Sequence, residues 1–345
     1  MTALTGAPLS GLLPASATTA TAAGAPWHHL PDGTFRNPPG SPGRGGTPAE
    51  WRSFMYRRLI QRTPAPALPA GHVLSAADAL AGLAGAGGDS VTWLGHACFL
   101  IRLGGRTLLT DPYLTRRASP FAWFGPERLA GPSLPPERLP PIDVLLLSHN
   151  HYDHLDLRAL ARLGDTSRTV AVMPLRVARY LDTSRFAMTV ELDWLQRTEV
   201  AGIGITATPA IHFSKRGLFD RNASLWCGFH LQAGGRALLF TGDTAYGPVF
   251  AQVAPRLPRP DLALVPIGAY DPRPLMQGSH CTPEEGVQIG LDWRAPRLCG
   301  MHWGTIQLTD EPPFEPPQRF RAAAAAAGYA EPDAWVMAIG ETRGW

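Results

Sequence analysis

Lysine is nearly missing from this 345-residue sequence, which has a single lysine, Lys215, beside thirty arginines. We interpret this bias, together with the abundance of Ala, Gly and Pro, as a property of coding and not as a sign of phosphate binding. The formal net charge is only +3, from 31 basic and 28 acidic residues. Because no block of like charge forms a basic stripe, we expect no nucleic-acid partner.

Cysteine is scarce as well, and long apolar runs are absent. The four cysteines show no C-x-x-C spacing, so the sequence predicts neither a disulfide framework nor a cysteine zinc knuckle and favours a reduced compartment. No apolar run reaches the ~18 residues that a membrane-spanning helix needs. The N-terminus has a short apolar centre without a preceding basic segment, which argues against a cleaved signal peptide. We expect a cytoplasmic protein, with peripheral association at a membrane left open and the periplasm less favoured.

The remaining sequence divides into three regions. Residues 1–48 are rich in Ala and Thr and then in Pro and Gly, which predicts a loose or extended segment. Residues 49–88 are expected to form a helical and linker region that packs on the core. Residues 89–345 have the strand and helix patterns of the main domain, and a hydrophobic content of 45% is enough for a sizeable core.

The second region opens with an amphipathic pattern. Trp51, Phe54, Met55 and Leu59 fall on one face of the predicted helix, and arginines lie mostly off that face. A basic helix of this kind can lie on a membrane surface. The favoured interpretation is that its apolar face packs against the main domain.

Short apolar runs in the main domain predict strands. The runs on either side of Gly104 and Gly105, and those on either side of Gly234 and Gly235, predict two analogous β-hairpins. Four near-continuous apolar runs are typical of strands that helices cover on both faces: IDVLLLS, TVAVMP, DLALVPIG and RLCGMHW. Helix starts are predicted at Asp156, as an N-cap, and at Thr282, which opens a capping box. The alternation predicts layered α/β architecture.

Three histidines and two aspartates crowd into SHNHYDHLDL, residues 148–157, directly after an apolar run. Alternate residues of an extended strand end point the same way, so one ion can bind His149 and His151 while the following turn brings Asp153 and His154 to a second. Two ions need more ligands than this cluster offers. The sequence has candidates at three further strand ends, namely His212, Asp243 and His302.

The order and spacing of these residues resemble the metallo-β-lactamase superfamily, as do LGHACFLI and TDPYL. Within it, PPIDVLLLSHNHYDHLD, VELDW, FTGDTAYG, PIGAYDPR, PEE and HWGT are similar to the N-acylphosphatidylethanolamine-hydrolysing phospholipase D family and its bacterial relatives. The resemblance runs from about residue 91 to residue 340. It implies an α/β fold, the αββα sandwich, in which two mixed β-sheets are flanked by helices and two Zn²⁺ ions per chain lie at one edge.

The resemblance also implies a role for each candidate ligand. The first zinc would be bound by His149, His151 and His212, the second by Asp153, His154 and His302, and Asp243 would bridge both. Imidazole and carboxylate ligands suit Zn²⁺ and leave room for a water. True β-lactamases of the superfamily usually have a cysteine where Asp243 stands. This departure argues against β-lactam hydrolysis and for phosphoester or ester chemistry.

We therefore expect a di-zinc hydrolase that cleaves a phosphodiester, with N-acylphosphatidylethanolamine or a similar phospholipid as the substrate that the family implies. A hydroxide shared by the metals would attack phosphorus directly, with Asp153 and Asp243 as catalytic residues. His280 matches a histidine that lines the family's active site, where it would bind phosphate or protonate a leaving oxygen; its alternative is a loop histidine or helix cap. Tyr152 matches a family tyrosine that contacts substrate, and the alternative role for Tyr152 is packing of the loop that contains the histidine motif.

Two more strand-end residues, Asp111 and His96, are expected to orient metal ligands from outside the ligand shell. The nearest alternative function is a lactonase or thioesterase acting on a small carboxyl ester, because related bacterial proteins use the same seven ligands for such reactions. A nucleic-acid-processing nuclease is disfavoured by the low charge. By analogy with the family, we expect a lipid-like substrate, contact with a membrane surface and a homodimer.

Overall fold

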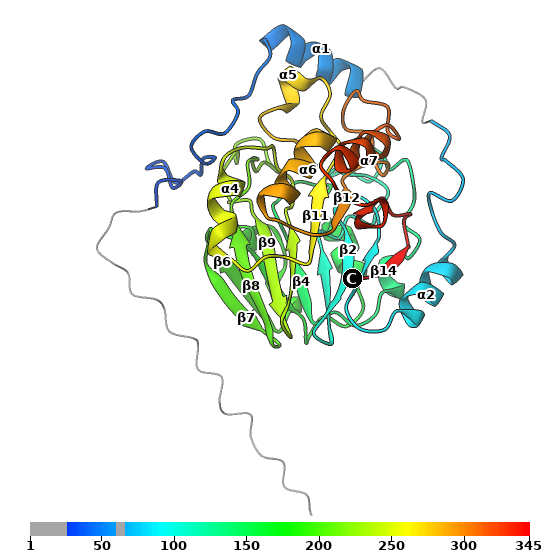
Figure 1. Cartoon of the computed structure of the whole chain (residues 1–345). Coiled ribbons are helices and arrows are strands. Elements are labelled where there is room, and N and C mark those ends of the chain that lie inside the picture. The colour runs from blue at the N-terminus through cyan, green and yellow to red at the C-terminus, as the bar shows by residue number, and fades with distance from the viewer. Residues whose placement is uncertain (1–25, 60–65) are drawn as a thin grey trace, which may run out of the picture.

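The structure, a computed structural model, describes residues 26–59 and 66–345. Within these residues two seven-stranded sheets face each other and helices cover their outer sides (Figure 1). This arrangement confirms the αββα sandwich with two mixed sheets. The part of the predicted N-terminal segment that precedes residue 26 lies outside the described residues.

The first sheet has the strand order β14-β1-β2-β3-β4-β5-β6. Strands β14, β1, β2 and β3 pair antiparallel, and β3, β4, β5 and β6 pair parallel. The bounds are β1 (Ser90–Trp93), β2 (Phe99–Leu103), β3 (Arg106–Thr110), β4 (Val144–Leu146), β5 (Val170–Pro174), β6 (Met188–Leu192) and β14 (Thr342–Gly344).

The second sheet has the order β13-β12-β11-β10-β9-β8-β7. Strands β7 to β10 pair antiparallel, and β10 to β13 pair parallel. The bounds are β7 (Arg197–Val200), β8 (Ile203–Thr208), β9 (Gly228–Ala233), β10 (Arg236–Phe240), β11 (Leu262–Pro266), β12 (Leu298–Met301) and β13 (Ala334–Trp335). The four near-continuous apolar runs form β4, β5, β11 and β12, which confirms them as strands of the parallel parts.

Both predicted hairpins are present, one in each sheet. Gly104 and Gly105 connect β2 to β3 with φ angles of +55° and +75°, and Gly234 and Gly235 connect β9 to β10 with +56° and +78°. Two successive residues with positive φ form the type I′ turn that suits the twist of a two-residue hairpin. Glycine reaches these angles without a steric penalty, so these residue pairs determine where each chain reverses.

The core follows the alternation of side chains along the strands. Phe99 and Ile101 of β2 point between the sheets, whereas Leu100 points outward and packs with Leu145 of β4. The cluster between the sheets is the larger one and extends across the second sheet to its helices. The outer cluster of the first sheet lies under α2 (Ala76–Gly85) and α3 (Leu157–Arg162).

Helices α4 (Val249–Val253), α6 (Pro283–Asp292) and α7 (Pro316–Ala326) cover the second sheet (Figure 1). The Asp156 carboxylate accepts from the backbone N–H groups of Arg158 and Ala159, and Thr282 forms the predicted capping box with Glu285. Both predicted caps are therefore confirmed. Short 3-10 helices occupy Pro136–Arg138, Ala178–Tyr180, Thr183–Arg185, Ala254–Arg256 and Glu331–Asp333.

Helix α1 (Pro48–Leu59) lies beside α5 (Arg273–Met276) at the top of Figure 1. Phe54 and Trp51 pack against Leu275 and Met276, while Met55 stays 45% exposed. The described part of the helix thus buries the aromatic part of its apolar face against the main domain. In the described residues we find no helix that is both long and apolar enough to cross a bilayer.

Candidate metal centre

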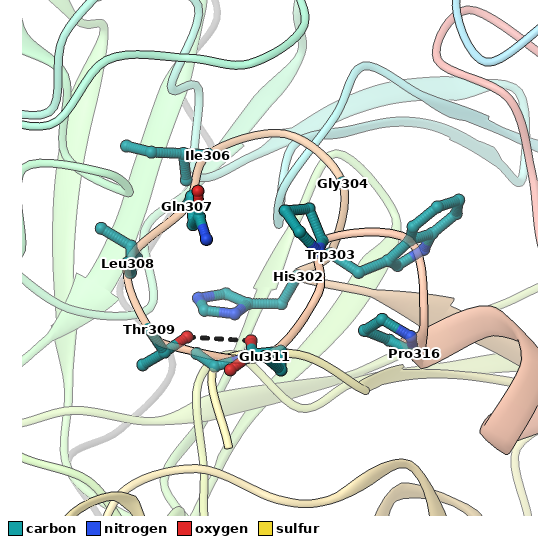
Figure 2. Close-up of a pocket in the computed structure, with 11 residues that line it drawn as sticks. His302, Trp303, Gly304, Ile306, Gln307, Leu308, Thr309, Glu311 and Pro316 are labelled. Atoms are coloured by element: carbon teal, nitrogen blue, oxygen red, sulfur yellow. Dashed lines mark hydrogen bonds between the residues drawn. The ribbon is translucent and has the colours of Figure 1, made fainter. Parts of the chain in front are cut away.

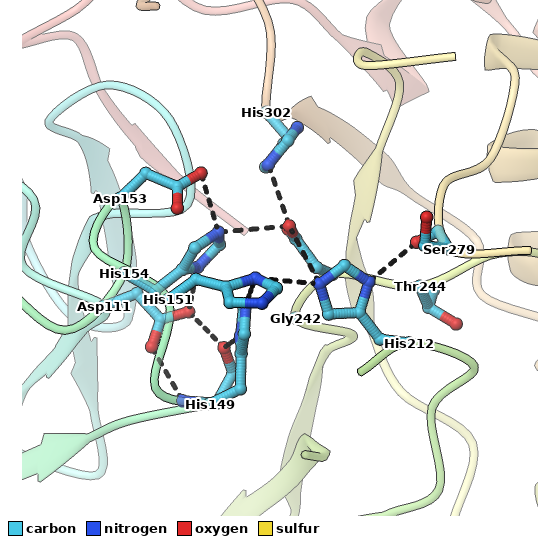
Figure 3. Close-up of polar contacts among 12 residues, drawn as sticks. Asp111, His149, His151, Asp153, His154, His212, Gly242, Thr244, Ser279 and His302 are labelled. Atoms are coloured by element: carbon cyan, nitrogen blue, oxygen red, sulfur yellow. Dashed lines mark hydrogen bonds and ion pairs between the residues drawn. The ribbon is translucent and has the colours of Figure 1, made fainter. Parts of the chain in front are cut away.

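The candidate ligands gather at strand ends where the edges of the two sheets meet (Figure 3). One loop after β4, which we call the metal loop (147–156), contains four of them, and β8, β10 and β12 of the second sheet each lead to one more. The first loop contributes His149, His151, Asp153 and His154, and the second sheet contributes His212, Asp243 and His302. The structure therefore brings together all seven candidate ligands from both sheets.

Three imidazoles form the first group. Nε2 of His149 is 2.8 Å from Nδ1 of His151, and Nε2 of His212 is 3.2 Å from the same atom. Donors bound to one tetrahedral zinc lie roughly 3.3 Å apart, given zinc–nitrogen bonds of ~2.0–2.1 Å. The spacing is thus close to that of three ligands around a single ion.

A carboxylate and imidazoles form the second group. Oδ2 of Asp153 is 3.6 Å from Nε2 of His154 and 2.9 Å from Nε2 of His96. With His302, one potential donor atom from each of these residues falls within 4.8 Å of the others. His96 thus contacts Asp153, and its ring lies 3.9 Å from that of His302 at a tilt of 37°, so its predicted role of orienting metal ligands stays a prediction.

Asp243 lies between the two groups. Its Oδ2 is 3.0 Å from Nε2 of His302, 3.1 Å from Nε2 of His154 and 3.8 Å from Nε2 of His212. One carboxylate oxygen therefore faces ligands of both groups. This is the position that a carboxylate bridging two ions requires.

Contacts outside the ligand shell fix the imidazole rings. Nδ1 of His154 is 2.8 Å from Oδ2 of Asp111, and Nδ1 of His212 is 2.9 Å from the carbonyl oxygen of Ser279. Nδ1 of His149 is 2.8 Å from Oγ of Ser148. Partners at Nδ1 leave the Nε2 lone pairs directed into the centre, as in established metal sites. Asp111 thus contacts a candidate ligand, as its predicted role requires.

Backbone strain accompanies these contacts. Asp111, His96 and His302 all have positive φ, at 33°, 57° and 64°. The N–H of His302 donates to the carbonyl oxygen of His96 at 3.1 Å, and the N–H of His96 donates to Oγ1 of Thr305 at 2.7 Å. Non-glycine residues persist in this region of conformational space only where surrounding contacts hold them, and such residues cluster at functional sites.

The electrostatics of the metal-free centre differ between its histidines. Burial lowers the pKa of His151 to about 3 and that of His212 to about 4, so both are neutral at pH 7. Burial also acts to lower the pKa of His154, but the carboxylates of Asp243, Asp153 and Asp111 outweigh it and raise that pKa well above its usual value. His154 therefore carries a proton between carboxylates when no metal is bound. The charge on His154 in turn lowers the pKa of Asp243 despite its burial.

The residues fit a pair of metal ions. Among the described residues, Oδ1 of Asp243 is buried without a hydrogen-bond partner, and Nε2 of His154 and Nε2 of His302 lie near Oδ2 of Asp243 without hydrogen-bond geometry. An unsatisfied buried polar group costs about 1–3 kcal/mol, and metal coordination would remove that cost here. A set of imidazoles and carboxylates without thiolate suits Zn²⁺ and other divalent cations of similar preference.

His280 and Tyr152 make different contacts around this centre. The His280 ring is 5.1 Å from the ring of His212 and 5.4 Å from that of His302, so it stands next to ligands of both groups. The Tyr152 hydroxyl donates to the carbonyl oxygen of Arg216 at 3.0 Å, and the Arg216 guanidinium lies 4.0 Å from the tyrosine ring. Tyr152 thus packs the metal loop in this structure. A substrate role for either residue stays a prediction.

A small cavity is lined in part by His302 (Figure 2). Trp303, Gln307 and Glu311 are among its lining residues, and its volume is about 10 Å³. Glu311 accepts from the N–H of Ala269 at 2.6 Å and from Oγ1 of Thr309 at 2.8 Å, which holds the loop after β12 in place. The cavity holds about one water molecule and is too small for a substrate.

Several supporting residues were not predicted from the sequence. Oδ1 of Asn37 accepts from the N–H of His212 at 3.0 Å, so the N-terminal segment supports a candidate ligand. His28 and His29 place Nε2 atoms 2.6 and 2.7 Å from the two carboxylate oxygens of Asp193. These are hydrogen-bond lengths, so we interpret this second His/Asp cluster as a clamp that holds residues 26–37 on the main domain. Only two of these residues lie in segments that the sequence analysis singled out, Ser148 in the histidine motif and Asp193 in VELDW.

Known proteins with similar sequences and folds include metal-dependent hydrolases. Residues 106–303 match the family described as "Beta-lactamase superfamily domain". The chain is 36% identical over 242 residues to the N-acyl-phosphatidylethanolamine-hydrolyzing phospholipase D 1 of Caenorhabditis elegans, covering 67% of this chain and 68% of that protein. It is 33% identical over 249 residues to the mitochondrial enzyme of the same description from Saccharomyces cerevisiae, covering 69% of this chain and 52% of the yeast protein. A metallo hydrolase of Ignicoccus hospitalis has the same fold, with a TM-score of 0.54 at 22% identity over 74% of this chain and 97% of that chain.

Proposed function

Because this chain belongs to the metallo-β-lactamase superfamily and is a metal-dependent hydrolase, we propose that it binds two metal ions, most simply Zn²⁺, and hydrolyses a phosphodiester of a phospholipid. N-acylphosphatidylethanolamine is the substrate that we propose. Cleavage of the bond between phosphorus and the ethanolamine oxygen would give phosphatidic acid and an N-acylethanolamine. The printed names of the worm and yeast relatives support this choice. The likeness of fold supports only the class of enzyme, since one fold serves many reactions.

The observation that carries the proposal is the position of Asp243. Its Oδ2 faces His154, His302 and His212 at 3.0–3.8 Å, so a single oxygen is shared between the two groups of ligands. The four cysteines are buried and free, and none is in a group that could hold a metal within the described residues. The donor set is therefore histidine and aspartate throughout.

Two ions at this centre would lower the pKa of a shared water, supply hydroxide near neutral pH and neutralise charge on the phosphoryl oxygens. The chain's own residues prepare the site for that chemistry. Asp111, Ser148 and Ser279 hold the rings of the ligand histidines, so little reorganisation is needed when charge develops.

The position of His280 supports a role in binding the substrate. Its ring lies beside both groups of ligands, and burial lowers its pKa well below the usual value, so it is neutral at pH 7. A neutral imidazole can donate a hydrogen bond to a phosphoryl oxygen. We propose this role for His280 and none for Tyr152 beyond packing.

Product analysis tests the proposal. Protein loaded with zinc is incubated with N-acylphosphatidylethanolamine in ¹⁸O-labelled water, and lipid products are identified by mass spectrometry. We expect phosphatidic acid carrying ¹⁸O and an unlabelled N-acylethanolamine. Label in the alcohol product would contradict attack at phosphorus. Hydrolysis of lactones or thioesters with no phosphodiester cleavage would replace the proposal with carboxyl-ester chemistry, and metal analysis giving a single ion per active chain would overturn the two-metal site.

A further inference from the structure

Two loops beside the metal centre expose large apolar side chains. Phe121, Trp123 and Phe124 are 50%, 76% and 40% exposed, and Leu218 and Phe219 are 83% and 98% exposed. In the first loop the rings of Phe121 and Trp123 are 5.4 Å apart, and those of Trp123 and Phe124 are 6.0 Å apart. Clustered exposed apolar side chains are unusual on a monomer's surface and mark contact sites. We call these segments the aromatic loop (119–125) and the Leu–Phe loop (215–221).

Both loops are held firmly at their bases. Arg158 donates to the carbonyl oxygens of Arg117 and Ser119 at 2.7 and 3.2 Å, which anchors the aromatic loop to the start of α3. Arg216 donates to the carbonyl oxygens of Asn150 and Leu155 at 2.9 and 2.8 Å, which anchors the Leu–Phe loop to the metal loop. The exposed tips therefore project from fixed supports.

The loops border the same pocket. It has a volume of about 320 Å³, and its lining includes Ser119 and Pro120 from the aromatic loop, Arg216 from the Leu–Phe loop, and Tyr152 between them. Tyr152 stands between the candidate ligands His151 and Asp153 in the sequence. Both loops thus lie next to the segment that contributes four of the candidate metal ligands.

Basic side chains accompany the Leu–Phe loop. Lys215 and Arg221 are exposed on either side of its tip, and in the described part of the chain neither has an acidic partner within ion-pair distance. The Arg221 guanidinium lies 4.4 Å from the centre of the Phe213 ring. Positive charge without partners beside projecting aromatic side chains complements an anionic lipid surface, which attracts each nearby basic residue.

We propose that the aromatic loop and the Leu–Phe loop together form a docking surface for an anionic bilayer. Trp123, Phe121 and Phe219 enter the interfacial layer, where aromatic rings are favoured, and Lys215 and Arg221 contact the head groups. The bilayer would then meet the metal loop from its outer side. Docking on a bilayer does not depend on the proposed function. Delivery of a lipid substrate from that bilayer to the metal centre rests on the proposed function. The helix α1, which the sequence also offered for a membrane surface, has Trp51 and Phe54 packed on α5.

Vesicle partition tests this surface with a matched control. The wild-type chain is mixed with vesicles of phosphatidylcholine, with or without phosphatidylglycerol, and sedimented. We expect binding to the anionic vesicles, a loss of about tenfold or more in partition for Trp123→Ser with Phe219→Ser, and a loss restricted to anionic vesicles for Lys215→Gln with Arg221→Gln. Met55→Ser with Tyr56→Ser removes exposed apolar side chains of α1 instead, at 45% and 60% exposure, and should bind like wild type.

The single lysine gives an independent readout. A polarity-sensitive dye attached to Lys215 should be shielded from an aqueous quencher by anionic vesicles, and Lys215→Arg corrects for dye at the N-terminus. Absence of wild-type binding, or equal binding of the Trp123/Phe219 variant, overturns the surface. Loss of binding in the α1 variant alone assigns the contact to α1. A wild-type dimer that the Trp123/Phe219 variant makes monomeric, with no effect on lipid binding, assigns the patch to a second copy of the chain.

The outcome is separable from that for the proposed function. If the wild type binds vesicles without cleaving any phospholipid, the docking surface stands and the proposed substrate is wrong. If the Trp123/Phe219 variant cleaves a short-chain, water-soluble phosphodiester at the wild-type rate and vesicle lipid more slowly, the docking surface and the proposed function are both supported.

Discussion

In each sheet a hairpin closed by two glycines leads into parallel strands: β2 and β3 into β4 and β5, and β9 and β10 into β11 and β12. An aspartate follows the second hairpin strand in both cases, as Asp111 after β3 and Asp243 after β10. The two sheets thus contain the same unit. They contribute to the metal centre differently.

The first sheet contributes its candidate ligands from one loop, and the second contributes one from each of three strand ends. The two aspartates differ in the same way. Asp111 contacts Nδ1 of His154 from outside the ligand shell at 2.8 Å, whereas Asp243 faces Nε2 of the same ring at 3.1 Å from inside it. His154 lies between two aspartates that follow the two hairpins. The same unit can therefore contribute either a candidate metal ligand or the support of one, depending on which side of an imidazole the aspartate reaches.

Of the changes considered, Asp243→Asn should have the largest effect on activity. The amide removes the negative charge shared by both groups of ligands, so we expect kcat to fall about a thousandfold or more and fewer metal ions to be bound. The assay is phosphodiester hydrolysis beside metal analysis of the same sample. An unchanged circular dichroism spectrum is the control for folding. Activity within tenfold of wild type would refute the bridging position.

Asp111→Asn should have a smaller effect, because it alters a support and leaves every candidate ligand in place. Changes to such outer partners lower metal affinity or activity about 10- to 100-fold. The measurement is zinc affinity by competition with a chelator, together with kcat at saturating zinc. If excess zinc restores most of the activity to Asp111→Asn protein but none to Asp243→Asn protein, the two aspartates have the different roles that the geometry assigns. Equal losses at saturating zinc would erase the distinction.

The contrast between the halves also explains what could be predicted from the sequence. Four ligands in one loop form a motif that is visible without a fold, and the type I′ glycine pairs marked both hairpins. His212, Asp243 and His302 gained meaning only because each follows an apolar strand. The fold and the gathering of the seven residues were predictable for these reasons, while their binding of metal stays a prediction.

Other parts had no local signal. Strands β13 and β14 have two and three residues, and β14 reads Thr-Arg-Gly, which has no apolar alternation; their pairing depends on neighbours distant in the sequence. The support of His212 by Asn37, and the clamp between His28, His29 and Asp193, join residues more than 160 positions apart. Long-range polar contacts of this kind leave no periodic pattern, so a segment rich in Pro and Gly was expected to be loose.

Proton release on metal binding tests how the two aspartates act on His154. The aspartates on both sides raise its pKa, so the metal-free centre binds a proton that must leave before Nε2 can coordinate a metal. Zinc binding should release about one proton at neutral pH, and affinity should fall roughly tenfold for each pH unit below neutrality. Calorimetry in two buffers of different ionisation enthalpy measures the release. Asp111→Asn should lower the release, because one raising charge is lost; an identical release in that variant would mean that another group supplies the proton.

The same centre makes the metal-free fold sensitive to acid. The pKa values of His151 and His212 fall from about 6.5 in the unfolded chain to about 3 and about 4 in the folded chain. Between pH 6.5 and about 4 the unfolded chain therefore binds more protons, and stability is lost as the pH falls. The raised pKa of His154 acts in the opposite direction, since its contribution is present below pH 6.5 and is lost as the pH rises through its folded value. Thermal unfolding of chelator-treated protein should show a lower Tm at pH 5 than at pH 7, and His151→Asn with His212→Asn should flatten that dependence. A Tm that rises on acidification would show that His154 dominates.

The smallest expected effect distinguishes the two hairpin turns themselves. Gly104 and Gly234 have the same φ within one degree, +55° and +56°, so alanine at either position costs a similar amount of backbone strain, about 1–2 kcal/mol. A Cβ at Gly104 would lie 2.7 Å from the Cβ of Ala233 in the other hairpin, whereas a Cβ at Gly234 meets nothing within 4 Å. Gly104→Ala should therefore destabilise the protein by about 1 kcal/mol more than Gly234→Ala, as overpacking does. Urea unfolding of both variants at equal m-values measures this difference. Equal losses would mean that the hairpin tips separate enough to accept a methyl group, and a larger loss at Gly234 would reverse the comparison, since the tip of the second hairpin would then be the more constrained.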